Sequence, residues 1–330
     1  MTERQPSEEA AARRGLLPRA AEGALELLIA LRHPRNTRRY FRRFGRLPNY
    51  IHPRSFSEKM QWRKLFDRNA AFPVFCDKLA ARAFAQKVVP DLDAARLYWT
   101  GADPQAIPFD RLDPPYVVKP NNRSHAVILV RSRADVDEGA IIACCRGWLR
   151  SGPHGAPQGE WAYSVVPGRI LVEEFLSEPG TTDPPADYKV FVFDGRARFI
   201  YATSGRHSGG TRMRGIHAPD WSRLPWSGWG DSVKELPGGM AAPDGLARMV
   251  AAAERLACGI DHLRVDFYSL PGRLCLGEIT VYHSSGYATW VHEGTQSGGK
   301  APRDLDDEIG AAWTLPAIPL ATRARRGLLG

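Results

Sequence analysis

The sequence has few cysteines, no long apolar run and no acidic excess, and each absence narrows the class of protein. Five cysteines in 330 residues are too few, and odd in number, for a disulfide framework, so we expect all five to pack in the interior of a protein from a reducing compartment. No stretch approaches the ~20 apolar residues that cross a bilayer, and residues 1–20 are charged rather than signal-like. These absences predict a soluble, cytoplasmic protein whose contact with a membrane is at most peripheral.

Positive charge is concentrated in one short segment. The formal net charge is +9, and residues 32–46 (RHPRNTRRYFRRFGR) are dominated by arginine. Such a run can bind an anionic membrane surface or a polyanionic glycan, or it can be a solvated basic helix, and the sequence leaves these alternatives open. Aromatic residues do not alternate with the basic ones as in base-stacking surfaces, and no DNA- or RNA-binding motif is present. No nucleic-acid partner is therefore expected.

The chain divides into segments that differ in composition and periodicity. With 43% hydrophobic residues it can bury a sizeable core, and the alternation of strand and helix patterns predicts an α/β (α+β) protein with two or three subdomains. The predicted order is a disordered start (1–20), a basic helical segment (21–52), an N-terminal α/β region (53–115), a middle region (116–188), a last region (189–316) and a mobile basic tail (317–330).

Two carboxylates are the most informative chemical feature. Asp266 and Glu278 lie on two apolar runs joined by the turn signal Pro271-Gly272, which predicts a hairpin that places them opposite each other. Adjacent carboxylates repel each other unless a cation neutralises them, and oxygen ligands suit Mg²⁺ or Mn²⁺. The alternative is a hairpin with two surface acids.

Two further strands carry polar residues that suit a nucleotide. Lys119 ends a buried-strand pattern and is followed by a polar turn that includes Ser124, so it can reach a phosphate, although such a lysine can equally be a solvated edge residue. The apolar run 170–176 carries Glu173, and a strand of this kind can contact adenine through its backbone.

The order and spacing of these segments resemble the ATP-grasp superfamily, specifically its teichuronopeptide-biosynthesis (TupA-like) amide ligases. The resemblance covers about residues 53–316. It is carried by HPRSFSEKMQWRKLFDRN (52–69), CDKLAARAF (76–84), YVVKPNN (116–122), VEEFL (172–176), DYKVFVFDGRARFI (187–200), PDW (219–221) and RVDFYSLPGRLCLGEIT (264–280). It implies an ATP-grasp fold, with ATP bound between subdomains made from the middle and last regions.

The resemblance also implies roles for individual residues. It places nucleotide phosphates on Lys78 and Lys119, adenine against Glu173, Phe175 and Leu176, and the ribose against Glu178 or Asp187. The implied residues for catalysis are Lys189, which would reach a phosphate, and Arg264, which would lie over the transferred phosphoryl group. Asp266 and Glu278 become the ligands of Mg²⁺ or Mn²⁺.

The sequence departs from the family pattern at the loop that follows Lys119. This loop is usually glycine-rich and covers the phosphates, but here it reads Asn-Asn-Arg-Ser-His, residues 121–125. Bulky side chains hinder close approach of the backbone, so either Arg123 replaces the amide contacts or nucleotide binding is impaired. A third metal-ligand position, often Asn in the superfamily, is Thr280. A second loop, 204–217, is rich in glycine and in basic residues. It is either a solvated basic loop or, as the resemblance implies, a loop that closes with Arg206 over the γ-phosphate and the carboxylate substrate.

These features predict an ATP-dependent ligase that joins a carboxylate to an amine through an acyl phosphate. The resemblance implies a small-molecule or glycan carboxylate and an amine as partners, in cell-surface polysaccharide or glycopeptide assembly. Two other classes fit the same residues: an ATP-grasp kinase that phosphorylates a hydroxyl, and a non-catalytic protein that binds a polyanion or a membrane.

Overall fold

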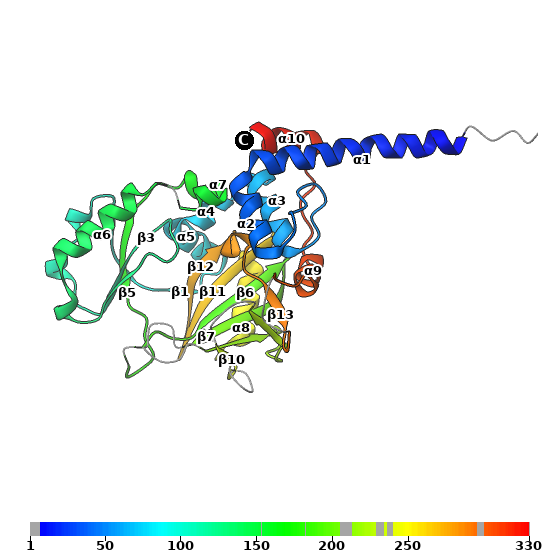
Figure 1. Ribbon diagram of the computed structural model, residues 1–330. Coiled ribbons are helices and arrows are strands. Elements are labelled where there is room, and N and C mark those ends of the chain that lie inside the picture. Colours follow the sequence, from blue (N-terminus) through cyan, green and yellow to red (C-terminus); the bar gives the residue numbers. More distant parts are fainter. Residues whose placement is uncertain are drawn as a thin grey trace, which may run out of the picture.

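The largest element of the fold is a seven-stranded sheet. The computed structural model describes residues 7–152, 154–181, 183–204, 213–228, 234–235, 240–295 and 300–329. Strand order is β1-β12-β11-β6-β7-β8-β10, and every pair from β12 to β8 is antiparallel (Figure 1). The strands are β1 (Asp93–Ala94), β6 (Asp187–Phe193), β7 (Arg196–Ser204), β8 (Met213–His217), β10 (Lys234–Glu235), β11 (His262–Leu270) and β12 (Arg273–Thr280).

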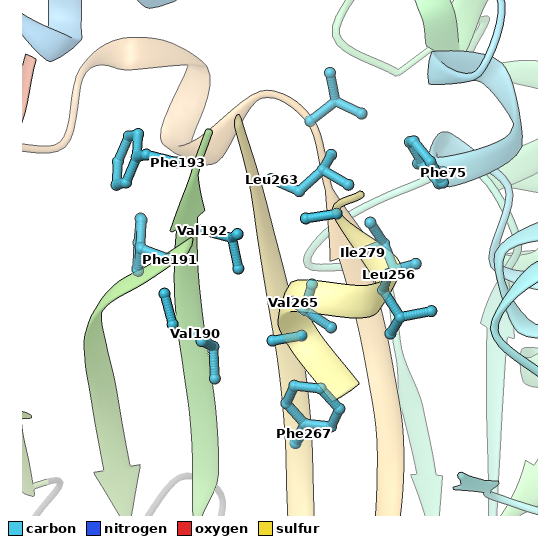
Figure 2. Packing of buried hydrophobic residues seen from close by; sticks show 14 of the residues in the cluster. Phe75, Val190, Phe191, Val192, Phe193, Leu256, Leu263, Val265, Phe267 and Ile279 are labelled. Carbon is cyan, nitrogen blue, oxygen red and sulfur yellow. The ribbon is translucent and has the colours of Figure 1, made fainter. Parts of the chain in front are cut away.

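The two faces of this sheet differ because side chains alternate along each strand. Val190, Val192 and Val265 lie on the face covered by α8 (Leu246–Leu256), whereas Phe191 and Phe193 point to the opposite side (Figure 2). Nearly all of these side chains are fully buried, so the main core extends over both faces. The second face is where polar side chains join the aromatic ones.

A smaller, four-stranded antiparallel sheet lies beside the large one, with the strand order β2-β5-β3-β4. The helix α6 (Glu138–Arg150) packs on it through buried Ile141 and Cys145 and has Asp137 as its N-cap. The strands are β2 (Leu97–Gly101), β3 (Tyr116–Pro120), β4 (Ile128–Val130) and β5 (Ile170–Glu174). Lys119 and Glu173 therefore sit on paired strands of a single sheet.

The predicted N-terminal α/β region is not a separate unit. Its strands β1 and β2 are close neighbours along the chain, yet β1 pairs with β12 of the large sheet and β2 pairs with β5 of the small one. The predicted boundary at residue 188 likewise falls inside β6. Strands this short carry too little periodicity to show from the sequence which sheet they join.

Both ends of the described chain are more regular than predicted. The first helix, α1, spans Ser7–Arg32, where disorder was expected up to residue 20, and the expected mobile tail forms α10 (Leu320–Leu329), which packs on α1 and α3 (Phe56–Phe66). Alanine, arginine and glutamate favour helix formation in the first segment. In the tail, Leu328 packs into the apolar cluster around Ile29.

Shorter elements complete the fold. They are α2 (Pro34–Phe44), α4 (Phe72–Cys76), α5 (Lys78–Val88), α7 (Trp161–Ser164), α9 (Asp304–Ala311), the paired strands β9 (Trp226–Gly228) and β13 (Trp290–His292), and the 3₁₀ turns η1 (Pro104–Ala106), η2 (Phe109–Arg111), η3 (Arg133–Asp135), η4 (Ala156–Gln158) and η5 (His283–Gly286). No described helix combines the length and the apolar character needed to cross a membrane.

The cysteines follow the prediction only in part. All five are free, and Cys76, Cys145 and Cys275 are buried, but Cys144 and Cys258 are exposed. The side chains of neighbouring helical residues point about 100° apart, so Cys144 and Cys145 cannot both lie on the side of α6 that packs on the small sheet. The expectation that every cysteine packs inside is therefore wrong for two of them.

Candidate active site

The predicted hairpin exists and brings the two carboxylates together. β11 and β12 pair antiparallel around the turn at Gly272, with Asp266 directly opposite Glu278. The pairing then shifts by one residue, because Gly277 is left out and Phe267 faces Leu276. This bulge places Leu276 on the apolar face with Phe267, so the polar face of β12 ends at Glu278.

Arg264 is the centre of the site. It lies two residues before Asp266 on the same face of β11, and its guanidinium forms a bidentate pair with Asp266 through Nε (2.6 Å to Oδ1) and Nη2 (2.7 Å to Oδ2). The same Nη2 donates to Oε1 of Glu278 at 2.6 Å. Arg264 thus offsets part of the charge of both carboxylates and keeps them in one place.

Three lysines add to this positive charge. Lys189 of β6 forms an ion pair with Asp187, and its Nζ lies 3.4 Å from Oδ2 of Asp266. Lys119 of β3 forms an ion pair with Glu173 of β5. The third, Lys78, is the first residue of α5, where Asp77 is the N-cap. The two sheets and α5 therefore contribute charges of both signs to one cluster.

The pKa values show that these groups act on one another across the two sheets. Burial would raise the pKa of Glu278, but Arg264, Lys78, Lys189 and Lys119 outweigh burial and hold it at about 2. Burial raises the pKa of Asp266, against the opposing effect of Arg264. Burial also lowers the pKa of Lys78, which the Glu278 carboxylate partly restores. Glu278 is therefore an anion at neutral pH, and it is surrounded by cations.

Comparison with known proteins assigns the family. The family model described as TupA-like ATPgrasp matches residues 58–298. The chain belongs to the TupA-like ATP-grasp family. None of the curated proteins matches the chain.

Solved structures related to this ATP-grasp protein are distant. It is similar to D-alanine–D-alanine ligase from Bacillus anthracis complexed with ATP (14% identity, 63% of this chain, 55% of that chain, TM-score 0.37). It is also similar to the ATP-grasp ligase PsnB complexed with minimal precursor (12% identity, 64% of this chain, 54% of that chain, TM-score 0.36). A third similar structure is an L-amino acid ligase from Bacillus licheniformis (14% identity, 64% of this chain, 44% of that chain, TM-score 0.40). The chain spans about half the length of these three structures.

The residues expected around adenine and ribose fall into two groups. Glu173 and Phe175 are buried at the end of β5 and just beyond it, and Asp187 is buried at the start of β6. Leu176 and Glu178 lie in the partly exposed segment between these two strands. This segment joins β5 of the small sheet to β6 of the large one. The contacts of these residues with adenine and ribose stay a prediction.

The loop 121–125 is held by its own side chains. The side-chain Nδ2 of Asn121 donates to Oδ1 of Asp77 (3.0 Å) and to the carbonyl of Pro167 (3.0 Å). The Oδ1 of Asn121 accepts from the backbone N–H of Arg169 (2.8 Å). Asn122 likewise donates to the Val166 carbonyl at 3.1 Å. These asparagines fix the path of the backbone, a structural role that the sequence analysis missed.

The loop also contacts the neighbouring segment that contains Gly152 and His154. Arg123 donates to the carbonyl of Gly152, and Oγ of Ser124 lies 2.8 Å from Nε2 of His154. The carbonyl of Arg123 accepts from Nζ of Lys78 at 2.6 Å. Arg123 thus faces a neighbouring loop, and its predicted contact with a phosphate stays a prediction. Arg206 lies outside the described residues.

His283 is a site residue that the sequence analysis did not single out. Its Nδ1 lies 2.6 Å from Nη1 of Arg264, and because the guanidinium can only donate, the imidazole accepts. Burial, together with the charge of Arg264, holds the pKa of His283 well below its usual range, so the ring is neutral. It stacks on Trp290 with centroids 5.3 Å apart. Because the contact joins η5 to β11, no local pattern could reveal it.

The donor set fits a divalent metal only with help from a substrate. Among the described residues no group of three or more His, Cys, Asp or Glu side chains could hold a metal, but Mg²⁺ is commonly bound by one or two carboxylates plus phosphate oxygens and water. Asp266 and Glu278 supply two carboxylates. At the third position Thr280 donates its hydroxyl to Glu278 (3.3 Å), and so it orients that carboxylate.

Proposed function

We propose that this protein is an ATP-dependent ligase that joins a carboxylate to an amine with formation of ADP and phosphate. The observation that carries the proposal is the contact of Arg264 with both facing carboxylates, in a cluster that also holds Lys78, Lys119 and Lys189. Such a cluster suits a polyphosphate and a transferred phosphoryl group, whose negative charges need several fixed cations. Membership of the ATP-grasp family supports the same nucleotide.

In the proposed reaction the carboxylate oxygen attacks the γ-phosphorus of ATP, and the bond to the β,γ-bridging oxygen breaks, which releases ADP. The amine then attacks the acyl carbon of the acyl phosphate, the C–O bond to phosphate breaks, and the amine gives up a proton to solvent. Neither step requires a covalent enzyme intermediate. The task of the protein is to position the reactants and to stabilise charge.

Each site residue has a proposed part in this task. Lys119 and Lys78 would bind phosphate oxygens from the side of the small sheet and α5, and Lys189 would do so from β6. Arg264 would stabilise the negative charge that develops on the acyl phosphate. Asp266 and Glu278 would hold Mg²⁺ or Mn²⁺, which when bound neutralises phosphate charge and polarises the transferred group.

The acceptor belongs to the proposal as well. We propose a carboxylate on a small molecule or a glycan, in cell-surface polysaccharide or glycopeptide assembly, on the ground of the family resemblance. Incubation with ATP, Mg²⁺ and candidate uronic acids or amino acids, with an amine donor, tests this. Amide product together with free phosphate supports the ligase, whereas phosphate retained on the product would indicate a kinase.

The shared premise is nucleotide binding, and a thermal-shift titration with ATP, ADP and Mg²⁺ tests it directly. We expect each nucleotide to raise the melting temperature in a concentration-dependent way, because a ligand that binds only the folded state stabilises it. No shift with any nucleotide, and no binding by calorimetry, would overturn the proposal.

A further inference from the structure

The end of α1 presents an apolar stripe to solvent. Leu27, Leu28 and Leu31 have 57%, 52% and 65% of their surfaces exposed, although Ile29 between them is fully buried. With 100° per residue the three leucines lie on one side of α1, and Ile29 lies on the other. A helix that needed only to cover the core would carry polar residues at these positions.

Exposed arginines follow this stripe on α2. His33 links the helices with a non-helical backbone (φ −115°, ψ 57°), so α2 takes its own direction, although the amides of His33 and Thr37 still donate to the carbonyls of Ile29 and His33. Arg35, Arg38 and Arg42 follow Leu31 at spacings of three and four and are all exposed. Within the described residues none of these three pairs with a carboxylate. The segment 27–47 contains no acid at all.

We propose that this face of α1 and α2, the leucine–arginine face, docks on an anionic lipid surface. Three observations favour lipid over other occupants. The leucines gain from an apolar phase, which a polyanionic glycan lacks. The arginines complement anionic headgroups, whereas on a second copy of the chain they would face like charges. An amphipathic helix with Leu on one side and Arg beside it is typical of segments that lie in a membrane interface.

The inner side of α2 connects this surface with the proposed ligase site, a link that rests on the proposed function. Arg39 lies over the Tyr287 ring at 4.2 Å, and Nε of Arg43 donates to the Tyr287 carbonyl at 3.2 Å. Tyr287 directly follows η5, whose His283 contacts Arg264. Docking would therefore place the η5 side of the site near the lipid surface, where a lipid-attached acceptor is within reach.

Co-sedimentation of the full chain with vesicles tests the proposal and needs no nucleotide, so its outcome is independent of the ligase assignment. We expect binding to phosphatidylcholine vesicles that contain phosphatidylglycerol, little binding to phosphatidylcholine alone, and loss of binding at high salt. Binding should weaken roughly fivefold for each arginine removed, and more for charge reversal. The triple variants Leu27→Ser/Leu28→Ser/Leu31→Ser and Arg35→Glu/Arg38→Glu/Arg42→Glu should both lose most of it.

Matched controls change exposed residues elsewhere: Arg111→Glu/Arg150→Glu/Arg198→Glu for charge, and Val127→Ser/Val165→Ser for apolar surface. Melting curves verify that every variant folds. Equal loss in the charge control would reduce the effect to net charge and overturn the proposal. Two other results would also overturn it. One is a dimer of the wild-type chain that the leucine variant dissociates. The other is tight binding to heparin that survives the leucine change, together with no binding to vesicles.

Discussion

At the scale of single residues, the geometry of the proposed site depends on how Arg264 shares its donors among Asp266, Glu278 and His283. The charged guanidinium is the donor in all four contacts, and the three to carboxylates join two charged groups at 2.6–2.7 Å. The arrangement leaves Arg264 with little freedom. A change at any partner should therefore alter the placement of the guanidinium as well as the local charge.

Asp266→Asn and Glu278→Gln should each abolish ATP turnover while the fold survives. Each change keeps the shape of the side chain but removes an anion that would hold the metal and pairs with Arg264, which should raise the barrier by several kcal/mol. Phosphate release at saturating Mg²⁺ and thermal melting provide the measurements. Asp110→Asn, at an exposed acid, is the control. Turnover near the wild-type rate in either variant would refute the metal assignment.

Lys119→Met should weaken nucleotide binding by roughly tenfold, or about 1.4 kcal/mol, because it deletes the proposed phosphate contact and keeps most of the side-chain volume. The change also leaves Glu173 unpaired, so the double variant Lys119→Met/Glu173→Gln separates the two effects. Calorimetric titration with ATP is the measurement, with exposed Lys87→Met as the control. If both variants bind ATP as tightly as the wild type, the lysine serves only its ion pair.

His283→Phe should lower kcat by tenfold or more, an order-of-magnitude expectation for a misplaced charged donor, with a much smaller change in the KM for ATP. Phenylalanine keeps the stacking on Trp290 but cannot accept from Arg264. His283→Asn keeps an acceptor and should retain more activity. Because the ring is neutral, its own titration should not appear in the rate profile near neutral pH. Equal activity of Phe and wild type would show that the contact does not position Arg264.

At the scale of elements, local patterns predicted the hairpin but not its surroundings. The turn at Pro271-Gly272 and the apolar runs on either side predict the hairpin, but plain alternation from that turn would pair Asp266 with Gly277. The bulge at Gly277, which the sequence pattern does not show, brings Glu278 opposite Asp266. The contacts of Arg264 with His283, and of Asn121 with Pro167, join elements that meet only in the folded chain. Two-residue strands such as β1 show no period. Their sheet could not be assigned from sequence for that reason.

The loop after β3 shows how the structure changes an expectation. A glycine-rich replacement of residues 121–125 would remove the hydrogen bonds of Asn121 and Asn122, so it should lower the melting temperature whatever it does to ATP binding. A replacement confined to Arg123, Ser124 and His125 avoids this loss. If Arg123 contacts phosphate, this shorter glycine variant should bind ATP because backbone amides substitute for the guanidinium, whereas Arg123→Ala alone should bind more weakly.

ATP titration of both loop variants and the wild type separates the alternatives. No effect of Arg123→Ala, combined with tighter binding by the glycine variant, would show that the natural loop has lost its phosphate contacts. A glycine variant that fails to bind ATP although it melts like the wild type would contradict the idea that amides can substitute for Arg123.

At the scale of the whole molecule, stability should depend on pH through a buried amine on α3. Lys64 is 1% exposed, and its Nζ donates to the carbonyl of Ser285 (3.0 Å). Burial lowers its pKa to about 7. The nearby Glu160 carboxylate acts to raise this pKa, and Arg39 acts to lower it further. The unfolded chain keeps the proton up to a pKa near 10.5, so between about pH 7 and pH 10 the unfolded state binds more protons and the stability contributed by this group rises with pH.

The free energy of unfolding of the wild type should therefore increase relative to Lys64→Met as pH rises through this window, by up to about 1.4 kcal/mol per pH unit. Denaturant melts at several pH values provide the measurement. Lys87→Met, at an exposed lysine in the last turn of α5, is the control. Parallel curves for Lys64→Met and wild type would show that Lys64 stays charged in the folded protein.

The contact between α1 and α10 has a consequence for the order in which the chain folds during synthesis. α10 follows α1 by about 290 residues, and at 5–20 residues per second the ribosome needs roughly 15–60 s to make that stretch. Until then Ile29 and Leu25 lack the cover of Leu328, while the leucines on the other side of α1 are exposed throughout. For most of its translation the nascent chain thus displays the leucine-rich C-terminal end of α1, followed by arginines, without the cover of α10. That helix is a natural early target for chaperones or for a nearby bilayer.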